Sequence, residues 1–159
     1  MGFDELVGTC ARYLKGMVSE SGSTNPRSIS PSENISVFYS AEKQKFSLDS
    51  YLKRVVTLVN ESSSVCFAAL VYLKRLSALD SRLRLNDYNV HRIFMTAFVL
   101  ASKMLEDEVY SNEHYARVGG IPSLLEMNKL EACMLSLLDF NLYISPEEYE
   151  STLSDTDSD

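Results

Sequence analysis

Apolar residues recur at helical spacing along most of this chain. Between residues 3 and 20 they lie three or four positions apart, which predicts an amphipathic helix. From about Phe46 the same pattern predicts five further helices, near 50–60, 64–79, 90–106, 111–118 and 123–139, and a short sixth over 146–153. Almost no segment alternates as a strand does. The sequence therefore predicts an all-α fold.

Polar breaks divide the chain into four parts. The amphipathic helix occupies 1–20, and the Ser-, Asn- and Pro-containing stretch after it predicts a flexible linker over 21–45. A helical domain is expected over 46–144, with Ser47 or Asp49 as the N-cap of its first helix and Gly119 and Gly120 ending its fourth. Residues 145–159 are expected to form a short helix and a disordered acidic tail.

Two charged residues interrupt helices that are otherwise apolar. Lys103 lies within "FVLASKMLED", and Glu131 lies between Met127 and Leu135 in a later helix. An unpaired buried charge is costly, so each is the natural partner of the other. One interpretation is a structural salt bridge, or two side chains that reach solvent along their stems. The other is an exposed pair, ringed by apolar side chains, that offers a donor and an acceptor to another protein.

The composition indicates one compact domain, and the charge bears on which partners it can bind. The chain has 159 residues, of which 45% are hydrophobic, enough for one compact domain with a core. The net charge is −7, and four acids in the last ten residues leave −3 for the remainder. This acidity argues against nucleic acid as the main partner.

The sequence gives no support for a membrane protein, a secreted protein, a metalloprotein or an enzyme. The longest uncharged stretches, 62–73 and 93–102, are shorter than the roughly 20 apolar residues that span a bilayer, and no secretion signal is present. The three cysteines are far apart, and neither histidine has a metal-like spacing. No catalytic motif stands out. We expect a soluble intracellular protein, cytoplasmic or nuclear, that is not an enzyme and has no metal, cofactor or membrane partner.

Four segments together resemble a known family. They are "FSLDSYLKRVVTLVN", "LVYLKRL", "VHRIFMTAFVLASKMLEDEVYSNEHYARVGG" and "EMNKLEACMLSLLDFNLYIS". In this order and at these separations they resemble the cyclin box of PHO-type (P/U-type) cyclins, over about Phe46 to Ile144. The resemblance implies a single five-helix cyclin box with an extra N-terminal helix and a short C-terminal one. It also implies a regulatory subunit that binds and activates a cyclin-dependent serine/threonine kinase, in phosphate sensing or the cell cycle.

The resemblance also implies which residues bind the kinase. In cyclins a lysine late in the third box helix and a glutamate early in the fifth grip the kinase, and Lys103 and Glu131 fall at those positions. Carried over in the same way, the expected kinase-binding set is Lys103, Met104, Glu131, Leu135, Phe140 and Leu142. The kinase's regulatory C-helix would lie across the apolar surface between these helices.

A second charged set comprises Arg92, Asp107 and Glu126. The structural interpretation is that Arg92 pairs with one or both acids. In PHO-type cyclins, acids and arginines at matching positions lie near the kinase activation segment. We therefore hypothesise that Asp107 offers negative charge to kinase arginines and partly replaces an activating phosphate.

The chain departs from cell-cycle cyclins in one informative place. Its first box helix, "SLDSYLKRV", lacks the Met-Arg-Ala-Ile-Leu sequence with which those cyclins recruit substrates. Substrate docking by that route is therefore not expected. The alternative function is a cyclin-fold transcription adaptor that contacts DNA or polymerase subunits.

Overall fold

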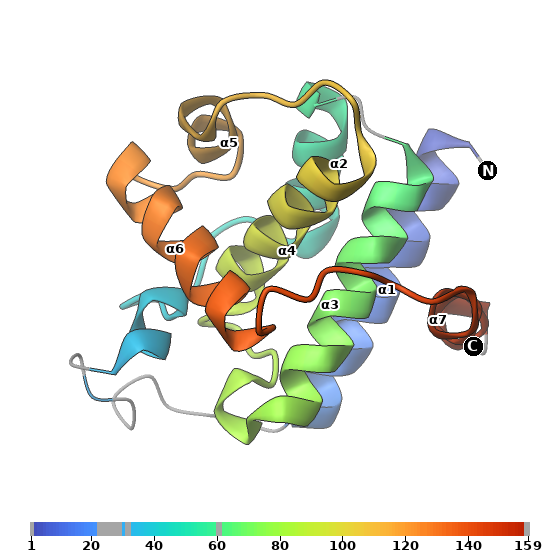
Figure 1. The fold of residues 1–159 in the computed structure, drawn as a ribbon, viewed down its shortest axis with the longest axis horizontal. Helices are drawn as coiled ribbons and strands as arrows, with labels where there is room; N and C mark the ends of the chain where they lie inside the picture. Colours follow the sequence, from blue (N-terminus) through green and yellow to red (C-terminus); the bar gives the residue numbers. More distant parts are fainter. Residues whose placement is uncertain (1, 22–29, 31–32, 60–61, 158–159) are drawn as a thin grey trace.

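The structure, a computed structural model, describes residues 2–21, 30, 33–59 and 62–157, and the regular secondary structure in these ranges is all helical (Figure 1). In these ranges it contains seven α-helices and two short 3-10 helices and no strand. The elements are α1 (Phe3–Ser21), η2 (Asn34–Phe38), α2 (Leu48–Val59), α3 (Ser63–Leu79), η3 (Ser81–Leu83), α4 (Val90–Leu105), α5 (Asn112–Val118), α6 (Leu124–Leu137) and α7 (Pro146–Asp157). The predicted all-α fold is confirmed.

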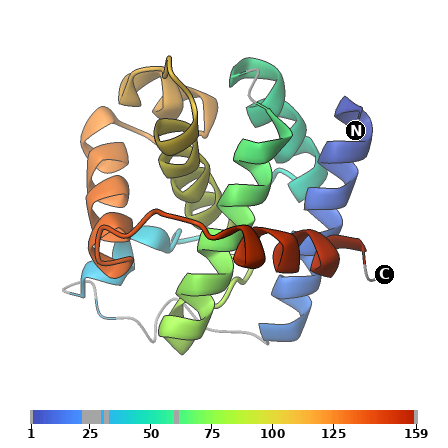
Figure 2. The same cartoon turned by 45° about the vertical axis from the view of Figure 1, so that its right-hand side comes forward.

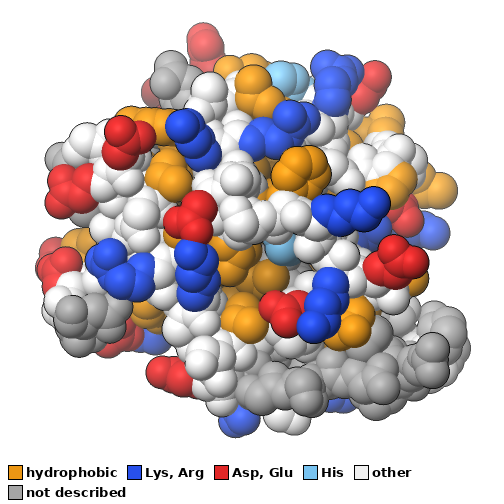
Figure 3. Space-filling model, turned by 180° about the vertical axis from the view of Figure 1, so that it is seen from behind, with side chains coloured by type: hydrophobic (Ala, Val, Ile, Leu, Met, Phe, Trp, Pro, Cys, Tyr) orange, Lys and Arg blue, Asp and Glu red, His pale blue; other side chains and the backbone are white. Residues whose placement is uncertain are grey.

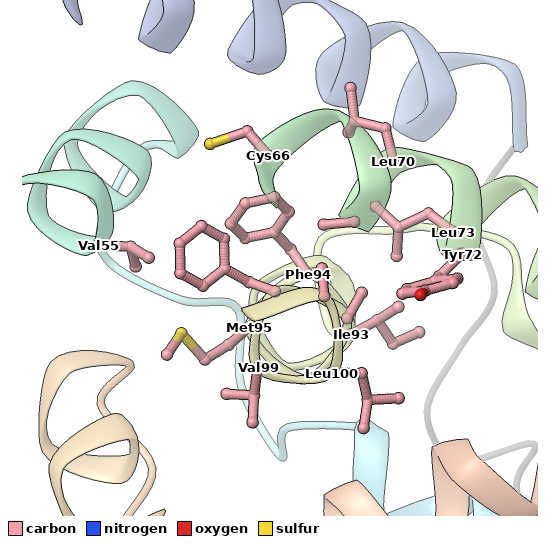
Figure 4. Packing of buried hydrophobic residues seen from close by; sticks show 14 of the residues in the cluster. Val55, Cys66, Leu70, Tyr72, Leu73, Ile93, Phe94, Met95, Val99 and Leu100 are labelled. Carbon is pink, nitrogen blue, oxygen red and sulfur yellow. The ribbon is translucent and has the colours of Figure 1, made fainter. Parts of the chain in front are cut away.

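Helix α4 forms the centre of the bundle. Figure 4 views it along its axis, with Ile93, Phe94, Met95, Val99 and Leu100 pointing outward from it toward the surrounding helices. Every residue from 93 to 102 is buried. A helix that is apolar around its whole circumference is stable only where other helices cover it on all sides, which explains why this segment lies innermost.

Helix α3 is the main partner of α4 and is itself buried from Val65 to Leu73. Helix α1 packs on α2 and α3 and buries Leu6, Cys10 and Leu14. Lys15 of α1 also forms an ion pair with Asp49 of α2. The N-terminal amphipathic helix therefore belongs to the bundle, and the surface that covers its apolar stripe is formed by α2 and α3.

Serine side chains and a glycine set several helix ends. Ser47 Oγ accepts from the backbone N–H of Ser50 at 3.2 Å, so Ser47 rather than Asp49 caps α2. Ser111 and Ser123 cap α5 and α6 in the same way. After α5 the chain turns through Gly120, whose φ of +68° is a conformation that glycine adopts without steric cost.

Two segments are more ordered than the sequence suggested. Residues 34–38, inside the predicted linker, form η2, which buries Ile35 and Phe38 and packs on α6. The rest of the predicted linker includes 22–29 and 31–32, which lie outside the described residues. The predicted helix over 146–153 is present, but the prediction of a disordered tail is wrong for residues 154–157, because α7 continues to Asp157 and lies across α3 and α1 (Figure 2). Thr152 and Thr156 of α7 are buried in that contact.

Candidate functional site

Lys103 and Glu131 form an ion pair between α4 and α6. The Nζ of Lys103, two residues before the end of α4, lies 2.7 Å from Oε2 of Glu131 in the middle of α6. The two side chains are 33% and 17% exposed. The pair is therefore neither split across the bundle nor sealed within it, and the pairing expected from the sequence is confirmed.

The side-chain amide of Asn112, the first residue of α5, bonds to both members of the pair. Its Oδ1 accepts from Lys103 Nζ at 2.8 Å, and its Nδ2 donates to Oε1 of Glu131 at 2.9 Å. The same Nδ2 lies 2.8 Å from Oδ1 of Asn128. Sequence reasoning missed both asparagines. The available signals were weak: Asn112 follows the capping serine of α5, and Asn128 lies three residues before Glu131 on one face of α6.

The four side chains leave hydrogen-bonding capacity unused. An ammonium has three donors, and Lys103 uses two of them on Asn112 and Glu131. A carboxylate has about four acceptor positions, and the contacts above occupy one on each oxygen of Glu131. A partner can therefore bond to both charged groups without breaking the contacts that orient them.

Helix α5, which carries Asn112, is fixed by side chains of α2. Tyr51 donates its Oη–H to the carbonyl of Gly119 at 2.7 Å. Arg54 donates from Nε to Val118 O at 2.9 Å and from Nη2 to Arg117 O at 3.2 Å. The last carbonyls of a helix have no partner inside the helix, so these bonds satisfy them and hold the short helix in place.

Apolar side chains flank the charged pair along the chain. Met104, next to Lys103, is 48% exposed, and Leu135, one turn after Glu131, is partly buried against the core. Further large apolar side chains that sequence reasoning did not single out are exposed at the ends of α4 and α6 and between them; they are Leu105, Val109, Tyr110, Leu124 and Leu125. Several large apolar side chains are thus exposed on the elements that carry the pair and on the segment that joins them.

The segment after α6 presents a different pair of apolar side chains from the one expected. Phe140 is 71% exposed, as a contact residue should be, but Leu142 is partly buried against the core. Tyr143, which the sequence analysis did not select, is 63% exposed. The backbone turns sharply here, with φ of 54° at Asp139 and 58° at Phe140.

Of the second charged set, Arg92, Asp107 and Glu126, the structure brings only Arg92 and Glu126 together. Arg92 Nη2 lies 3.4 Å from Oε2 of Glu126, and Arg92 Nη1 donates to the carbonyl of Val37 at 3.2 Å. Asp107 is exposed, and the ion pairs of the described residues do not include it. Arg92 lies in the first turn of α4 and Asp107 lies just beyond its end, roughly 20 Å away along the axis at 1.5 Å per residue. The three residues therefore do not form one cluster, and the expected pairing holds only for Arg92 and Glu126.

In the part of the chain that the structure describes, no three His, Cys, Asp or Glu side chains come close enough to share a metal ion. Nor does any helix there have the length and apolar character to cross a bilayer.

Comparison with known proteins identifies the family. The family model described as Cyclin matches residues 8–142, most of the chain. The chain belongs to the cyclin family. The match begins within α1, so this cyclin's N-terminal helix lies mostly inside the matched region, although the sequence analysis placed the box at 46–144.

The relatives point to one branch of the cyclins. The chain is 37% identical to Cyclin-U4-1 of Arabidopsis thaliana over 86% of its own length and 67% of the relative's. It is 37% identical to Cyclin-P4-1 of rice (Oryza sativa subsp. japonica), covering 74% of the chain and 55% of the relative. It is also 34% identical to the PHO85 cyclin-like protein psl1 of Schizosaccharomyces pombe, covering 72% and 47%. These similarities support a PHO-type cyclin, one that spans about half to two thirds of the length of these relatives.

Proposed function

We propose that this cyclin is the regulatory subunit of a cyclin-dependent serine/threonine kinase, which it binds and activates. The observation that carries the proposal is the Lys103–Glu131 pair, oriented by Asn112 and only partly exposed. The fission-yeast relative is named as a PHO85 cyclin-like protein, so a PHO85-type kinase is the partner to test first.

The proposed interface combines two kinds of contact. Exposed apolar side chains, including Met104 beside Lys103 and Phe140 after the end of α6, supply contact area, since most binding energy comes from a few well-packed apolar anchors. The free donor of Lys103 and the free acceptor positions of Glu131 bond backbone groups beside the kinase C-helix and set its register. Because Asn112 already orders both side chains, less conformational entropy is lost on binding.

Activation follows from where the C-helix is held. An isolated kinase of this class keeps the lysine and glutamate of its own active site apart. Docking the C-helix inward against the cyclin brings the two together and completes the kinase active site. In this mechanism the cyclin itself supplies no catalytic group.

Asp107 has a proposed secondary role. It is exposed, and among the described residues no cation forms an ion pair with it. An exposed carboxylate is available to pair with arginines of the kinase activation segment, as an activating phosphate does. Replacing Asp107 with Asn should lower kinase activation while the cyclin keeps its fold; unchanged activation would reject this role.

A binding experiment with a purified PHO85-type kinase tests the main proposal. Lys103→Ala and Glu131→Ala should each weaken binding by about thirtyfold or more, because truncating one member of an interfacial charge pair typically costs about 2 kcal/mol or more. Kinase activity toward a serine-containing peptide should fall in parallel. Calorimetry or biolayer interferometry gives the dissociation constant.

Lys74 and Asp155 offer a matched control. They form an ion pair of similar length, 2.6 Å, between α3 and α7, and their side chains are 36% and 45% exposed. Lys74→Ala and Asp155→Ala remove a lysine–carboxylate pair of the same kind outside the proposed contact surface. Equal losses of binding for both pairs, or full binding by Glu131→Ala, would contradict the proposal.

The transcription-adaptor alternative finds less support. On the face shown in Figure 3, basic and acidic side chains are interspersed over the area not covered by grey atoms, and no broad basic surface stands out. The net charge of −7 also opposes phosphate binding. Salt-sensitive retention on DNA, without kinase binding, would favour the alternative.

A further inference from the structure

Three consecutive backbone carbonyls after α6 accept hydrogen bonds from two side chains of α3. Tyr72 donates its Oη–H to Leu142 O at 2.7 Å. Arg75 donates from Nη1 to Asn141 O at 3.0 Å and from Nη2 to Tyr143 O at 2.5 Å. Extended backbone has no hydrogen bonds of its own, so these contacts fasten the segment to α3.

Arg75 is itself held in one orientation. Its Nε and Nη2 donate to the two carboxylate oxygens of Glu148, in the first turn of α7, at 2.8 and 2.5 Å. Its guanidinium also lies 5.6 Å from the centre of the Tyr72 ring. The fork–fork bond to Arg75 keeps the pKa of Glu148 below its usual value, so the carboxylate stays charged at neutral pH. Tyr72, Arg75 and Glu148 thus form one connected unit, here called the α3 clamp.

The clamped segment begins in a backbone conformation that is uncommon for its residues. Asp139 and Phe140 both have positive φ, although neither is glycine. Such residues persist only where surrounding contacts hold them, and they occur preferentially at binding and active sites. Backbone bonds from Phe140 N to Leu135 O at 2.8 Å and from Asn141 N to Leu138 O at 3.0 Å close the turn on the side of α6.

Two large aromatic side chains remain exposed on this fastened segment. Phe140 is 71% exposed and Tyr143 is 63% exposed, while Leu142 between them packs toward the core. In a mobile loop, such side chains would pack onto the nearest apolar surface. The loop would then lose conformational entropy when a partner bound and ordered it. Holding the backbone in advance removes much of that cost.

We propose that Tyr72 and Arg75 are positioning residues of the kinase-binding surface, which hold the 140–143 segment so that Phe140 and Tyr143 meet the kinase as preformed anchors. The inference rests on the proposed function. It adds Tyr143 as a contact residue. It also gives Tyr72 and Arg75 of α3 a role in kinase affinity, although their side chains do not themselves touch the kinase.

Two substitutions and two readouts test this inference. Tyr72→Phe removes one hydroxyl and keeps the ring, and Arg75→Lys keeps the charge and loses the fork. In the free cyclin, amide hydrogen exchange over 140–145 should become several times faster in both variants. The dissociation constant for a purified PHO85-type kinase should rise about threefold to tenfold for Tyr72→Phe and at least about tenfold for Arg75→Lys.

Lys74→Ala provides the matched control. Lys74 precedes Arg75 on α3 and also bonds α7, through Asp155, but it donates to none of the three carbonyls. This variant should leave exchange over 140–145 and the dissociation constant unchanged. Circular dichroism at the assay temperature checks that each variant is folded. A merely structural role for Arg75 would lower stability without the faster exchange confined to 140–145.

The outcomes separate the two proposals. If the unaltered chain binds no such kinase, the proposed function fails and the positioning role fails with it, whatever the exchange rates show. If the unaltered chain binds and both clamp variants bind equally well, the positioning role alone is overturned. Faster exchange over 140–145 together with weaker kinase binding supports it.

Discussion

Asn112 Nδ2 lies 2.9 Å from Oε1 of Glu131, so an uncharged residue of α5 orients the carboxylate proposed to meet the kinase. Asn112 Oδ1 also accepts from Lys103 at 2.8 Å, which makes it the bridge between the two charges. Replacing Asn112 with Ala should free both side chains to adopt other rotamers. We expect the dissociation constant for a PHO85-type kinase to rise about threefold to tenfold, measured by calorimetry.

Glu113→Ala is the appropriate comparison for this substitution. Glu113 is the next residue of α5, its side chain is 71% exposed, and its ion pair with Arg117 is long, at 3.8 Å. Exposed pairs of this kind contribute little to stability. Kinase binding should be unchanged by Glu113→Ala, and a loss equal to that of Asn112→Ala would show that α5 acts through its general surface charge.

The helices were predictable because their apolar spacing is strong and several ends carry recognisable caps. The Lys103–Glu131 pair was also predictable, because an unpaired charge in a buried helix is costly and each residue was the available partner for the other. Asn112 could not be found in this way. A neutral amide after a helix cap has no periodicity, and its role depends on how three helices meet.

The helix η2 and the last turn of α7 were not predicted, because polar residues concealed their pattern. In η2, Ile35 and Phe38 have helical spacing, but serine, asparagine and proline around them favoured a linker. In α7 the buried positions 152 and 156 are one turn apart but are occupied by threonine, so the stripe looked polar. Arg92 and Asp107 were grouped by their charge and by the resemblance to PHO-type cyclins, but α4 separates them along the bundle.

Gly119 is expected to tolerate no side chain. A Cβ at this position would collide with Cγ of Met95 and lie 2.8 Å from its Sδ, in the tightly packed core around α4. Gly119→Ala should therefore lower the free energy of unfolding by about 1 to 3 kcal/mol, as overpacking does. Urea denaturation measures the change.

Gly120→Ala distinguishes crowding from backbone strain at this turn. A Cβ on Gly120 meets no atom within 4 Å, but its φ of +68° disfavours any other residue. Gly120→Ala should lower the free energy of unfolding by about 1 kcal/mol. Shortening Met95 to Ala should partly rescue Gly119→Ala and give no rescue of Gly120→Ala; equal behaviour of the two glycines would contradict the crowding argument.

Protonation of His91 should make the fold less stable in mild acid. His91 is buried, its Nε2–H donates to the carbonyl of Phe46 at 3.0 Å, and its Nδ1 is buried with no partner. Burial lowers the pKa of His91 below its ordinary value of 6.5, against smaller opposing effects of that hydrogen bond and of Asp87. The stability contributed by neutral His91 is present above pH 6.5 and is lost as the pH falls from there through the lower folded pKa.

Urea denaturation between pH 8 and pH 5 tests this dependence. The midpoint should fall with pH in the unaltered chain and change less in His91→Gln, which cannot be protonated. The chain has two histidines, and His114→Gln serves as the comparison. Glu148, whose pKa is lowered by Arg75, loses its contribution only below its ordinary value of 4.5, outside this window. An identical slope in His91→Gln and the unaltered chain would assign the effect elsewhere.

A charge placed on the buried face of α7 should disrupt the packing of α7 on α3 and α1, which the sequence analysis did not predict. Thr152 is fully buried and donates to the carbonyl of Glu148 at 3.1 Å, whereas the neighbouring Ser151 is exposed. Thr152→Glu places a carboxylate where no water reaches it, and should lower the free energy of unfolding by at least about 2 kcal/mol. Ser151→Glu adds the same charge one position earlier and should change it by less than about 0.5 kcal/mol. If both substitutions proved equally mild in thermal denaturation, α7 would not be packed on the bundle in solution, and the anchor that Glu148 gives to Arg75 would be lost with it.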